Sequence, residues 1–149
     1  MEERFVVKKF YELTNDELFE IYKLRAEVFV RDQNCPYVDI DNADKKAYHI
    51  FLPDEKGIKA YLRMMEKDEE FDMTRIGRVI AREKRTGIGS KLMKFSLDFA
   101  RNVLKTDSVK VEAQTYAKKF YEKQNFVQTS EEFLEDNIPH VEMICRFNS

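Results

Sequence analysis

Residues 78–90 read R-V-I-A-R-E-K-R-T-G-I-G-S and lead directly into K-L-M-K-F-S-L-D-F-A. The first letters favour a strand, and the last ones repeat apolar residues at helical spacing. The turn between them holds Gly87 and Gly89, which let the backbone bend sharply and approach a ligand without a Cβ in the way. The first N–H groups of the following helix have no intrahelical acceptor. The segment therefore predicts an anion site, with a pyrophosphate as the first hypothesis.

Three cations near this turn, Lys84, Arg85 and Lys91, add positive charge. A plain strand-to-helix turn with two glycines and no ligand is the alternative interpretation. The chain lacks the Gly-x-x-x-x-Gly-Lys-Ser/Thr string of a P-loop. Leu92 stands where a dinucleotide-binding fingerprint needs its third glycine, so both of these other phosphate loops are disfavoured.

The turn resembles the coenzyme A pyrophosphate loop of the GNAT family of N-acetyltransferases, whose usual pattern is Gln/Arg-x-x-Gly-x-Gly/Ala. The matching residues are Lys84, Arg85, Thr86, Gly87, Ile88 and Gly89. Lysine in the first position keeps the charge but loses the planar fork of arginine. A register that uses Arg85 is also open, and in the family the backbone does most of the phosphate binding.

A second match covers residues 109–126, V-K-V-E-A-Q-T-Y-A-K-K-F-Y-E-K-Q-N-F, which predict a short buried strand and then a helix. One face of that helix holds Ala117, Phe120, Tyr121 and Gln124. GNAT chains carry a similar A-x-x-F-Y-x-K-x-G-F string at this point. Asn125 replaces its glycine, and asparagine is the next-best residue for a left-handed helix end.

Residues 10–44 closely resemble the opening of the ElaA-like acetyltransferases, with their core L-R-x-x-V-F-V-x-[E/D]-Q-x-C-P-Y-x-x-x-D. Residues 138–143, I-P-H-V-E-M, are similar to the Gly-Ile-Pro-His-x-x-Met ending of that group. Together the matches span nearly the whole chain. The resemblance implies a single GNAT N-acetyltransferase domain over residues 1–149, of mixed α/β (α+β) class. Its central, partly parallel, twisted sheet is flanked by helices.

Hydrophobic periodicity and turn residues predict the order of the elements. Thr14 and Glu17 form a capping box that opens the first helix, and residues 35–45 are expected to be irregular. The expected strands are residues 4–10, 46–53, 57–66, 73–81, 109–113, 126–130 and 140–147. The two later helices are expected at residues 88–104 and 116–124.

The composition fits a small enzyme: 149 residues, 43% hydrophobic, with a formal net charge of −2. This charge disfavours a nucleic-acid binder, whose footprint is normally strongly basic. Without a long apolar run or a signal-peptide pattern, we expect a cytoplasmic protein with no membrane partner. Cys35 and Cys145 lie far apart, so we expect reduced thiols and no metal site. The many aromatic residues leave a homodimer open.

The resemblance implies direct transfer of an acetyl group from acetyl-CoA to a primary amine. In GNAT folds the thioester lies where two neighbouring parallel strands separate, expected here at residues 76–81 and 109–113. The backbone N–H of Val79 or Ile80 is then the expected donor to the thioester carbonyl oxygen. The residues expected to bind the cofactor are Val79, Ile80, Ala81, Lys84, Arg85, Thr86, Gly87, Ile88, Gly89, Ser90, Gln114, Ala117 and Phe120.

Tyr121 matches the family's tyrosine that protonates the departing thiolate, and an amphipathic core tyrosine is the alternative. The general base is less defined, because the strand expected at residues 73–81, where many relatives carry a glutamate, has no carboxylate. The base then lies elsewhere or acts through water. The first candidates are His140 and Asp32, which lie in the ElaA-like strings, and Glu112 and His49 follow.

The acceptor is constrained only by charge. Asp32, Asp39, Asp41 and Asp44 crowd the segment that covers the acceptor side in GNAT folds, which predicts attraction of a cationic amine such as a polyamine, an amino sugar or a lysine side chain. Arg25 either lines the acceptor pocket or anchors this segment. Two other functions stay open: a non-catalytic acyl-CoA sensor or scaffold, and a transferase for a longer acyl chain.

Overall fold

The computed structural model describes residues 4–32, 39–83 and 85–147. Its strands are β1 (Val6–Lys9), β2 (Tyr48–Asp54), β3 (Gly57–Met65), β4 (Thr74–Ala81), β5 (Ser108–Gln114), β6 (Phe126–Gln128), β7 (Phe133–Glu135) and β8 (Ile138–Arg146). Its α-helices are α1 (Asn15–Arg25), α2 (Ile88–Asn102) and α3 (Lys118–Lys123), and α1 continues into a π-helix (Ala26–Asp32). Short 3-10 helices cover Phe10–Glu12, Asn42–Lys45 and Thr115–Ala117.

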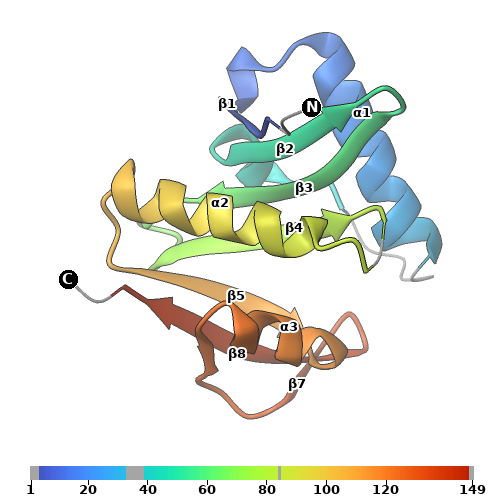
Figure 1. The fold of residues 1–149 in the computed structure, drawn as a ribbon. Coiled ribbons are helices and arrows are strands. Elements are labelled where there is room, and N and C mark those ends of the chain that lie inside the picture. The colour runs from blue at the N-terminus through green and yellow to red at the C-terminus, as the bar shows by residue number, and fades with distance from the viewer. Residues whose placement is uncertain (1–3, 33–38, 84, 148–149) are drawn as a thin grey trace.

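One eight-stranded sheet organises the chain, in the order β1-β2-β3-β4-β5-β8-β6, with β7 also paired to β8. Strands β4 and β5 run parallel, and the other pairings between the described strands are antiparallel. This arrangement confirms the expected mixed, partly parallel sheet. Figure 1 shows α2 and α3 lying on the same side of the sheet.

Helix α1 begins where the capping box predicts. The Glu17 N–H donates to the Thr14 hydroxyl at 3.0 Å, and the Thr14 N–H donates to the Glu17 carboxylate at 2.9 Å. These reciprocal bonds satisfy two N–H groups that a helix start otherwise leaves unpaired. The end of α3 is also as predicted, because Asn125 adopts a left-handed φ of 71°.

The sequence analysis missed β7. Its hairpin with β8 turns through Asp136 and Asn137, whose φ values of 50° and 64° match a two-residue type I′ turn. The prediction also started the last strand at residue 140, whereas β8 begins at Ile138. A two-residue Asp-Asn turn between short extended segments was the signal for this hairpin. It was overlooked because β7 has only three residues, of which two are exposed.

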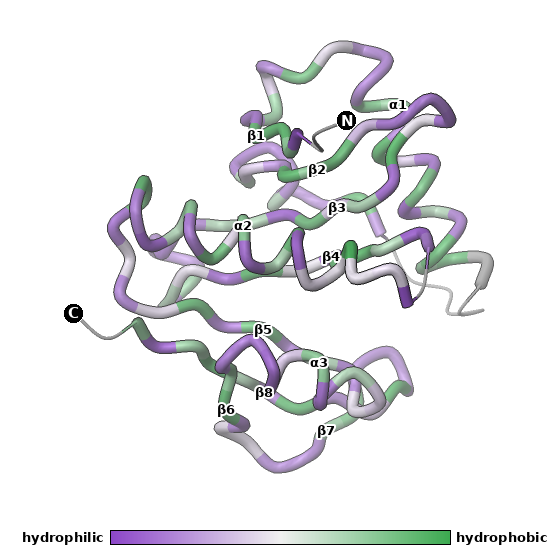
Figure 2. The backbone as a smooth tube through the Cα atoms, in the orientation of Figure 1, coloured by the Kyte–Doolittle hydropathy of each residue, from purple (hydrophilic) through white to green (hydrophobic). Residues whose placement is uncertain are grey.

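Two hydrophobic clusters cover the two faces of the sheet. Under α2 and α3, buried residues of the sheet such as Leu62, Ile76 and Val111 pack against Leu92 of α2. On the opposite face, Ile80 belongs to the cluster that includes the apolar side of α1. Figure 2 shows hydrophobic and hydrophilic residues alternating around the turns of α2, as expected for a helix with one face on a sheet.

Strands β4 and β5 separate after a short parallel pairing. Their register lasts only from Thr74 opposite Val109 to Ile76 opposite Val111. Beyond that point the two strands diverge, as Figure 1 shows. The expected separation of these strands is therefore confirmed.

A β-bulge lies in β4 directly after this point. The register with β3 shifts so that two residues of β4, Arg78 and Val79, lie opposite Leu62. Arg78 has a φ of 54°, in the left-handed region that side chains other than glycine rarely adopt. Such bulges re-aim a strand and are frequent beside active sites.

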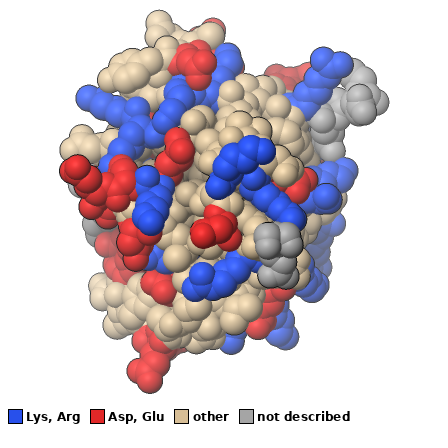
Figure 3. Space-filling model, turned by 90° about the vertical axis from the view of Figure 1, so that its left-hand side faces the viewer, with Lys and Arg blue, Asp and Glu red and all other residues tan. Residues whose placement is uncertain are grey.

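The remaining expectations concern the surface and the cysteines. No helix within residues 4–32, 39–83 and 85–147 is long and apolar enough to cross a membrane. Figure 3 shows acidic and basic side chains interspersed on one face of the molecule. Cys145 is a buried free thiol whose pKa is raised by burial, while Cys35 lies outside the described residues.

Candidate active site

A cavity of about 1280 Å³ lies where β4 and β5 separate. From the side of α2 and α3 it is lined by Ala81, Phe120 and Tyr121. From the other side it is lined by Glu112 and His140. Glu112 points to that side because its strand neighbours Val111 and Ala113 belong to the core under α2 and α3. The cavity is thus open to groups from both faces of the sheet.

The first turn of α2 forms one end of this cavity. Gly87 caps the helix with a left-handed φ of 79°, and the first helical bond runs from the Lys91 N–H to the Gly87 carbonyl at 3.1 Å. The N–H groups of Ile88, Gly89 and Ser90 therefore have no acceptor within the helix. All three residues line the cavity. This geometry suits a bound phosphate or diphosphate.

The cavity collects most of the residues expected to bind a cofactor. Those that line it are Val79, Ile80, Ala81, Arg85, Gly87, Ile88, Gly89, Ser90, Gln114, Ala117 and Phe120. Thr86 is not among the lining residues, and its hydroxyl donates to the Glu83 carbonyl at 3.1 Å. Lys84 lies outside the described residues.

Tyr121 enters the cavity from α3. Its side chain is buried and packs edge-on against Phe120 and Phe126, with ring centroids 5.1 and 5.5 Å away. Burial, and then nearby Tyr116, raises the pKa of the Tyr121 phenol above its usual value. The phenol consequently keeps its proton at neutral pH and is able to donate a hydrogen bond.

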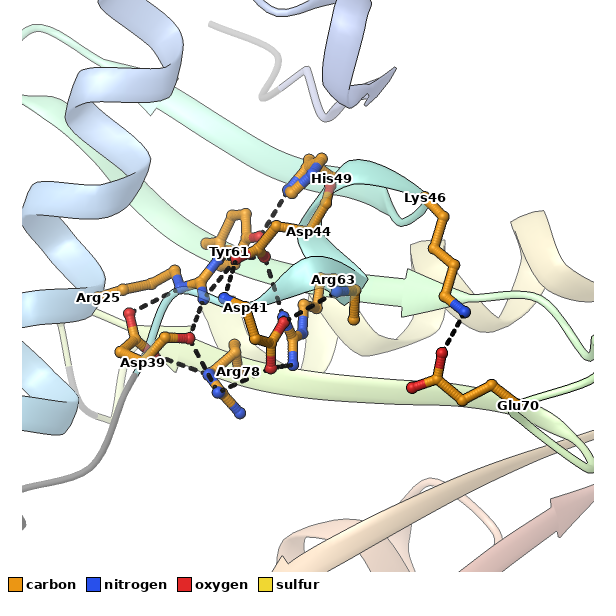
Figure 4. Close-up of polar contacts among 11 residues, drawn as sticks. Arg25, Asp39, Asp41, Asp44, Lys46, His49, Tyr61, Arg63, Glu70 and Arg78 are labelled. Carbon is orange, nitrogen blue, oxygen red and sulfur yellow. Dashed lines mark hydrogen bonds and ion pairs between the residues drawn. The ribbon is translucent and has the colours of Figure 1, made fainter.

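The aspartates expected to attract a cation are instead neutralised by arginines. We call this group the arginine–aspartate network; it consists of Arg25, Arg63, Arg78, Asp39, Asp41 and Asp44 (Figure 4). Three positive charges offset three negative charges. The charge of these three aspartates, which was expected to draw in a cationic amine, is therefore balanced within the protein, and the nature of the acceptor stays a prediction. The side chain of Asp32, the fourth acid of that prediction, lies outside the described residues.

Arg25 is the centre of the network. Its fully buried guanidinium donates to the Asp44 carboxylate at 2.6 Å, to the Asp39 carboxylate at 3.1 Å and to the Asp39 carbonyl at 2.8 Å. From the sequence, Arg25 could either line the acceptor pocket or anchor the acidic segment. Its contacts with Asp39 and Asp44 show that it anchors this segment. Although burial opposes ionisation, the guanidinium of Arg25 and then that of Arg63 hold the pKa of Asp44 below its usual value.

The network also holds the bulge of β4. The Arg78 guanidinium donates to the Asp39 carboxylate at 2.7 Å and to the Asp39 carbonyl at 3.0 Å. Arg63 donates to Asp41 at 2.6 Å and to Asp44 at 3.0 Å. These contacts fix the strained residue that precedes Val79.

His49, a candidate base, has a structural position. Its ring is buried between the Tyr61 hydroxyl at 2.7 Å and the Asp44 carbonyl at 2.9 Å. Burial lowers the pKa of His49. His49 does not line the cavity, so it lies too far from the site to accept a substrate proton.

Asp41, Arg63 and Arg78 of the network line the cavity, and so does a second charged group on strands β4, β5, β7 and β8. The His140 Nε2 atom is 3.7 Å from a Glu135 carboxylate oxygen, and the Arg75 guanidinium is 3.6 Å from Glu112. Burial, and then the nearby Glu112 carboxylate, raises the pKa of the Glu135 carboxyl. Glu112 and His140 were candidates from sequence, whereas Glu135 was missed together with β7.

The family model of the acetyltransferase (GNAT) domain matches residues 20–147. The chain belongs to the GNAT family. This GNAT protein is 38% identical over 143 residues to a UPF0039 protein of Schizosaccharomyces pombe, covering 93% of this chain and 94% of that one. The expected family membership is thereby confirmed.

Solved structures of the GNAT fold agree with this assignment. The crystal structure of Escherichia coli ElaA superposes with a TM-score of 0.90 at 30% identity, covering 97% of this chain and all of that one (100%). The structure of an acyl-CoA N-acyltransferase from Pseudomonas aeruginosa gives a TM-score of 0.87 at 33% identity, covering 95% and 99% of the two chains. The protein therefore has the acyl-CoA N-acyltransferase fold.

Proposed function

We propose that this GNAT protein transfers an acetyl group from acetyl-CoA directly to a primary amine. The observation that carries the proposal is the cavity between β4 and β5, which joins the first turn of α2 to Tyr121 and to the opposite face of the sheet. A donor bound by its diphosphate on one face can then meet an acceptor that enters from the other.

The donor is bound mainly by the backbone. The free N–H groups of residues 88–90 take the diphosphate, and Arg85 adds positive charge beside them. The pantetheine arm follows the exposed edge of β4, as an added strand follows a sheet edge. The N–H of Val79 or Ile80 donates to the thioester carbonyl oxygen, and one such donor stabilises the developing oxyanion by about 3 to 4 kcal/mol.

Tyr121 serves the leaving group. As the amine attacks the thioester carbon, the C–N bond forms, the C–S bond breaks, and the phenol donates its proton to the departing sulfur. A free thiol has a pKa of about 8.5, so the demand for an acid is modest. Because a non-catalytic sensor has no need of this phenol, its place in the cavity favours the transferase.

The acceptor's ammonium must lose a proton before attack. His140 is the base that we favour, because its ring lies in the cavity on the face opposite the cofactor. Asp32 stays a prediction. The cytoplasmic location and a homodimer also stay predictions, and the family description favours acetyl over a longer acyl chain.

Calorimetric titration with acetyl-CoA, free CoA and a longer acyl-CoA tests the donor site, and thiol release with a mixed amine panel tests transfer. We expect micromolar binding and amine-dependent release that is fastest with acetyl-CoA. Binding without release for any amine would favour the sensor, and an absence of binding would contradict the whole proposal.

A further inference from the structure

The β7–β8 hairpin brings four side chains to one face of the sheet. Phe133 lies opposite His140 and Glu135 lies opposite Ile138 in the antiparallel register. Since alternate residues of a strand share a face, Glu135 and His140 both project to the side opposite α2 and α3. The Phe133 and His140 rings stack with centroids 6.0 Å apart and planes inclined by 23°.

The hydrogen bond of the imidazole fixes its tautomer. The His140 Nδ1 atom is 2.7 Å from the Ile138 carbonyl oxygen, which can only accept a hydrogen bond. Nδ1 therefore carries the proton of the neutral ring, and Nε2 has a free lone pair. The Nε2 atom faces the Glu135 carboxylate at 3.7 Å, longer than a hydrogen bond.

Both residues line the cavity, but their exposures differ. The His140 side chain is only 9% exposed, whereas that of Glu135 is 48% exposed. An imidazolium formed at this buried position needs a nearby negative charge, and Glu135 supplies it. The other charged groups around the pair are Glu112 of β5, Arg75 of β4, which contacts Glu112, and Asp136 of the turn. The Lys110–Glu142 ion pair lies farther along the same face.

We propose that Glu135 is a positioning residue for proton removal: it stabilises the imidazolium that forms when His140 Nε2 takes a proton from the acceptor's ammonium. This inference rests on the proposed transferase function. It adds a residue from a strand that the sequence analysis did not predict.

The acceptor's ammonium loses two protons during the reaction, and each has a defined receiver. One ammonium proton moves to His140 Nε2, and the neutral amine attacks the thioester carbon. When the tetrahedral intermediate collapses, Tyr121 gives its proton to the departing sulfur. The second proton of the attacking nitrogen then returns to the phenolate of Tyr121. The products are the amide and free CoA thiol, and His140 releases one proton to solvent.

The first test is an NMR titration of the ring atoms in the free protein. The chain has only two histidines, so His140→Gln assigns the signals. We expect the neutral His140 ring to be protonated at Nδ1. In Glu135→Gln its titration should move to lower pH by roughly half a pH unit or more. Glu132→Gln, on the exposed loop before β7, is the matched control and should leave the curve unchanged.

This titration uses neither CoA nor an acceptor, so it remains readable if the transferase proposal fails. A ring protonated at Nε2, or a titration that Glu135→Gln does not move, would overturn the inference. A variant that fails to fold is recognised by its amide spectrum, and Glu135→Ala, which also removes the charge, then replaces it, with Glu135→Asp as the charge-keeping comparison. The aspartate keeps the charge and should retain most of the wild-type titration.

The second test is the pH profile of kcat/KM with the amine that gives the fastest thiol release. Without the negative charge of Glu135, protonation of the imidazole is less favourable, so the rise of activity with pH should begin at lower pH. The plateau of this kcat/KM profile should fall by about 10-fold to 100-fold. An unshifted profile, or a change confined to the KM for acetyl-CoA, would contradict the proposed role.

Discussion

Two groups of charged side chains lie on the same face of the sheet, and they differ in how completely their charges are paired. In the arginine–aspartate network, the contacts of Arg25 with Asp39 and Asp44 are 2.6 to 3.2 Å long and its guanidinium is fully buried. In the cavity, the Glu112 carboxylate lies 3.6 Å from the Arg75 guanidinium, and the Glu135 carboxylate lies 3.7 Å from the imidazole of His140. The acids around Arg25 are therefore closely paired, whereas the carboxylates of the second group are held by longer contacts.

The two groups show that a high density of acidic residues along a chain does not by itself locate a binding site. Asp39, Asp41 and Asp44 are close together in sequence, yet arginines from α1, β3 and β4 neutralise them. Glu112 and Glu135 are far apart in sequence, yet strand pairing to β8 brings both beside His140. The proposed site is built around the group whose charged contacts are longer.

The largest effect should come from breaking the network. Arg25→Ala removes the buried cation that Asp39 and Asp44 share and leaves each of these carboxylates with a single arginine, so we expect a loss of about 3–5 kcal/mol in the free energy of unfolding. Denaturant unfolding measures it. Lys94→Ala is the control, since its ion pair with Asp98 is 3.6 Å long and exposed, and it should cost less than about 0.5 kcal/mol. Equal small losses in both variants would mean that the network is dispensable.

Tyr121→Phe should lower kcat by about 10-fold to 100-fold, because it removes only the leaving-group acid. Affinity for acetyl-CoA should be unchanged, since the ring still packs against Phe120 and Phe126. The control is Tyr116→Phe, whose hydroxyl is lost from an exposed position at the cavity rim. Thiol-release kinetics decide the matter: an undiminished kcat in Tyr121→Phe would make this residue a packing tyrosine.

Gly87→Ala should weaken acetyl-CoA binding about tenfold and lower stability by about 1–2 kcal/mol, because alanine disfavours the φ of 79°. Gly89→Ala is the control for stability: a Cβ there lies 3.5 Å from Phe120, an ordinary contact, and Gly89 has no left-handed φ. Calorimetry and thermal unfolding compare the two. If Gly87→Ala binds acetyl-CoA as tightly as the wild type, the turn does not hold the diphosphate.

The smallest effect is a difference in the sign of the pH dependence of stability. The pKa of Glu135 is raised by burial and by Glu112, so the folded state binds this proton more tightly. Its contribution is present below the unfolded pKa of about 4.3 and is lost as pH rises through the folded pKa. Stability relative to Glu135→Gln should therefore fall as pH rises above about 4.

Asp41 should show the opposite dependence. Burial opposes its ionisation, but Arg63 holds its pKa below the usual value. Its contribution is present above the unfolded pKa of about 3.9 and is lost as pH falls through the folded pKa. Unfolding of wild type, Glu135→Gln and Asp41→Asn across pH measures both signs. The same sign for both acids would remove the distinction between the two groups.

The sequence predicted the parts of the fold that depend on local chemistry. The capping box of Thr14, the left-handed Asn125 and the glycine turn before α2 are all properties of a few adjacent residues. The separation of β4 and β5 followed from the family resemblance. Pairings that form only in three dimensions were beyond sequence reasoning, among them Arg25 with Asp44.

In the site, too, the residues that follow from local sequence were predicted, and a residue that depends on strand pairing was not. Most of the residues expected to bind a cofactor line the cavity, because they belong to one continuous strand, turn and helix. Glu135 was missed because its role depends on a three-residue strand. The Asp-Asn turn at residues 136 and 137 was a readable signal for that strand.

The most direct test of the central claim is a crystal structure of the protein with acetyl-CoA. The account predicts the diphosphate on the N–H groups of residues 88–90 and the thioester between β4 and β5. The carbonyl oxygen should accept from the N–H of Val79 or Ile80, and the sulfur should lie beside the Tyr121 hydroxyl. Acetyl-CoA bound outside the gap between the strands, or a thioester remote from Tyr121, would contradict the proposed transferase.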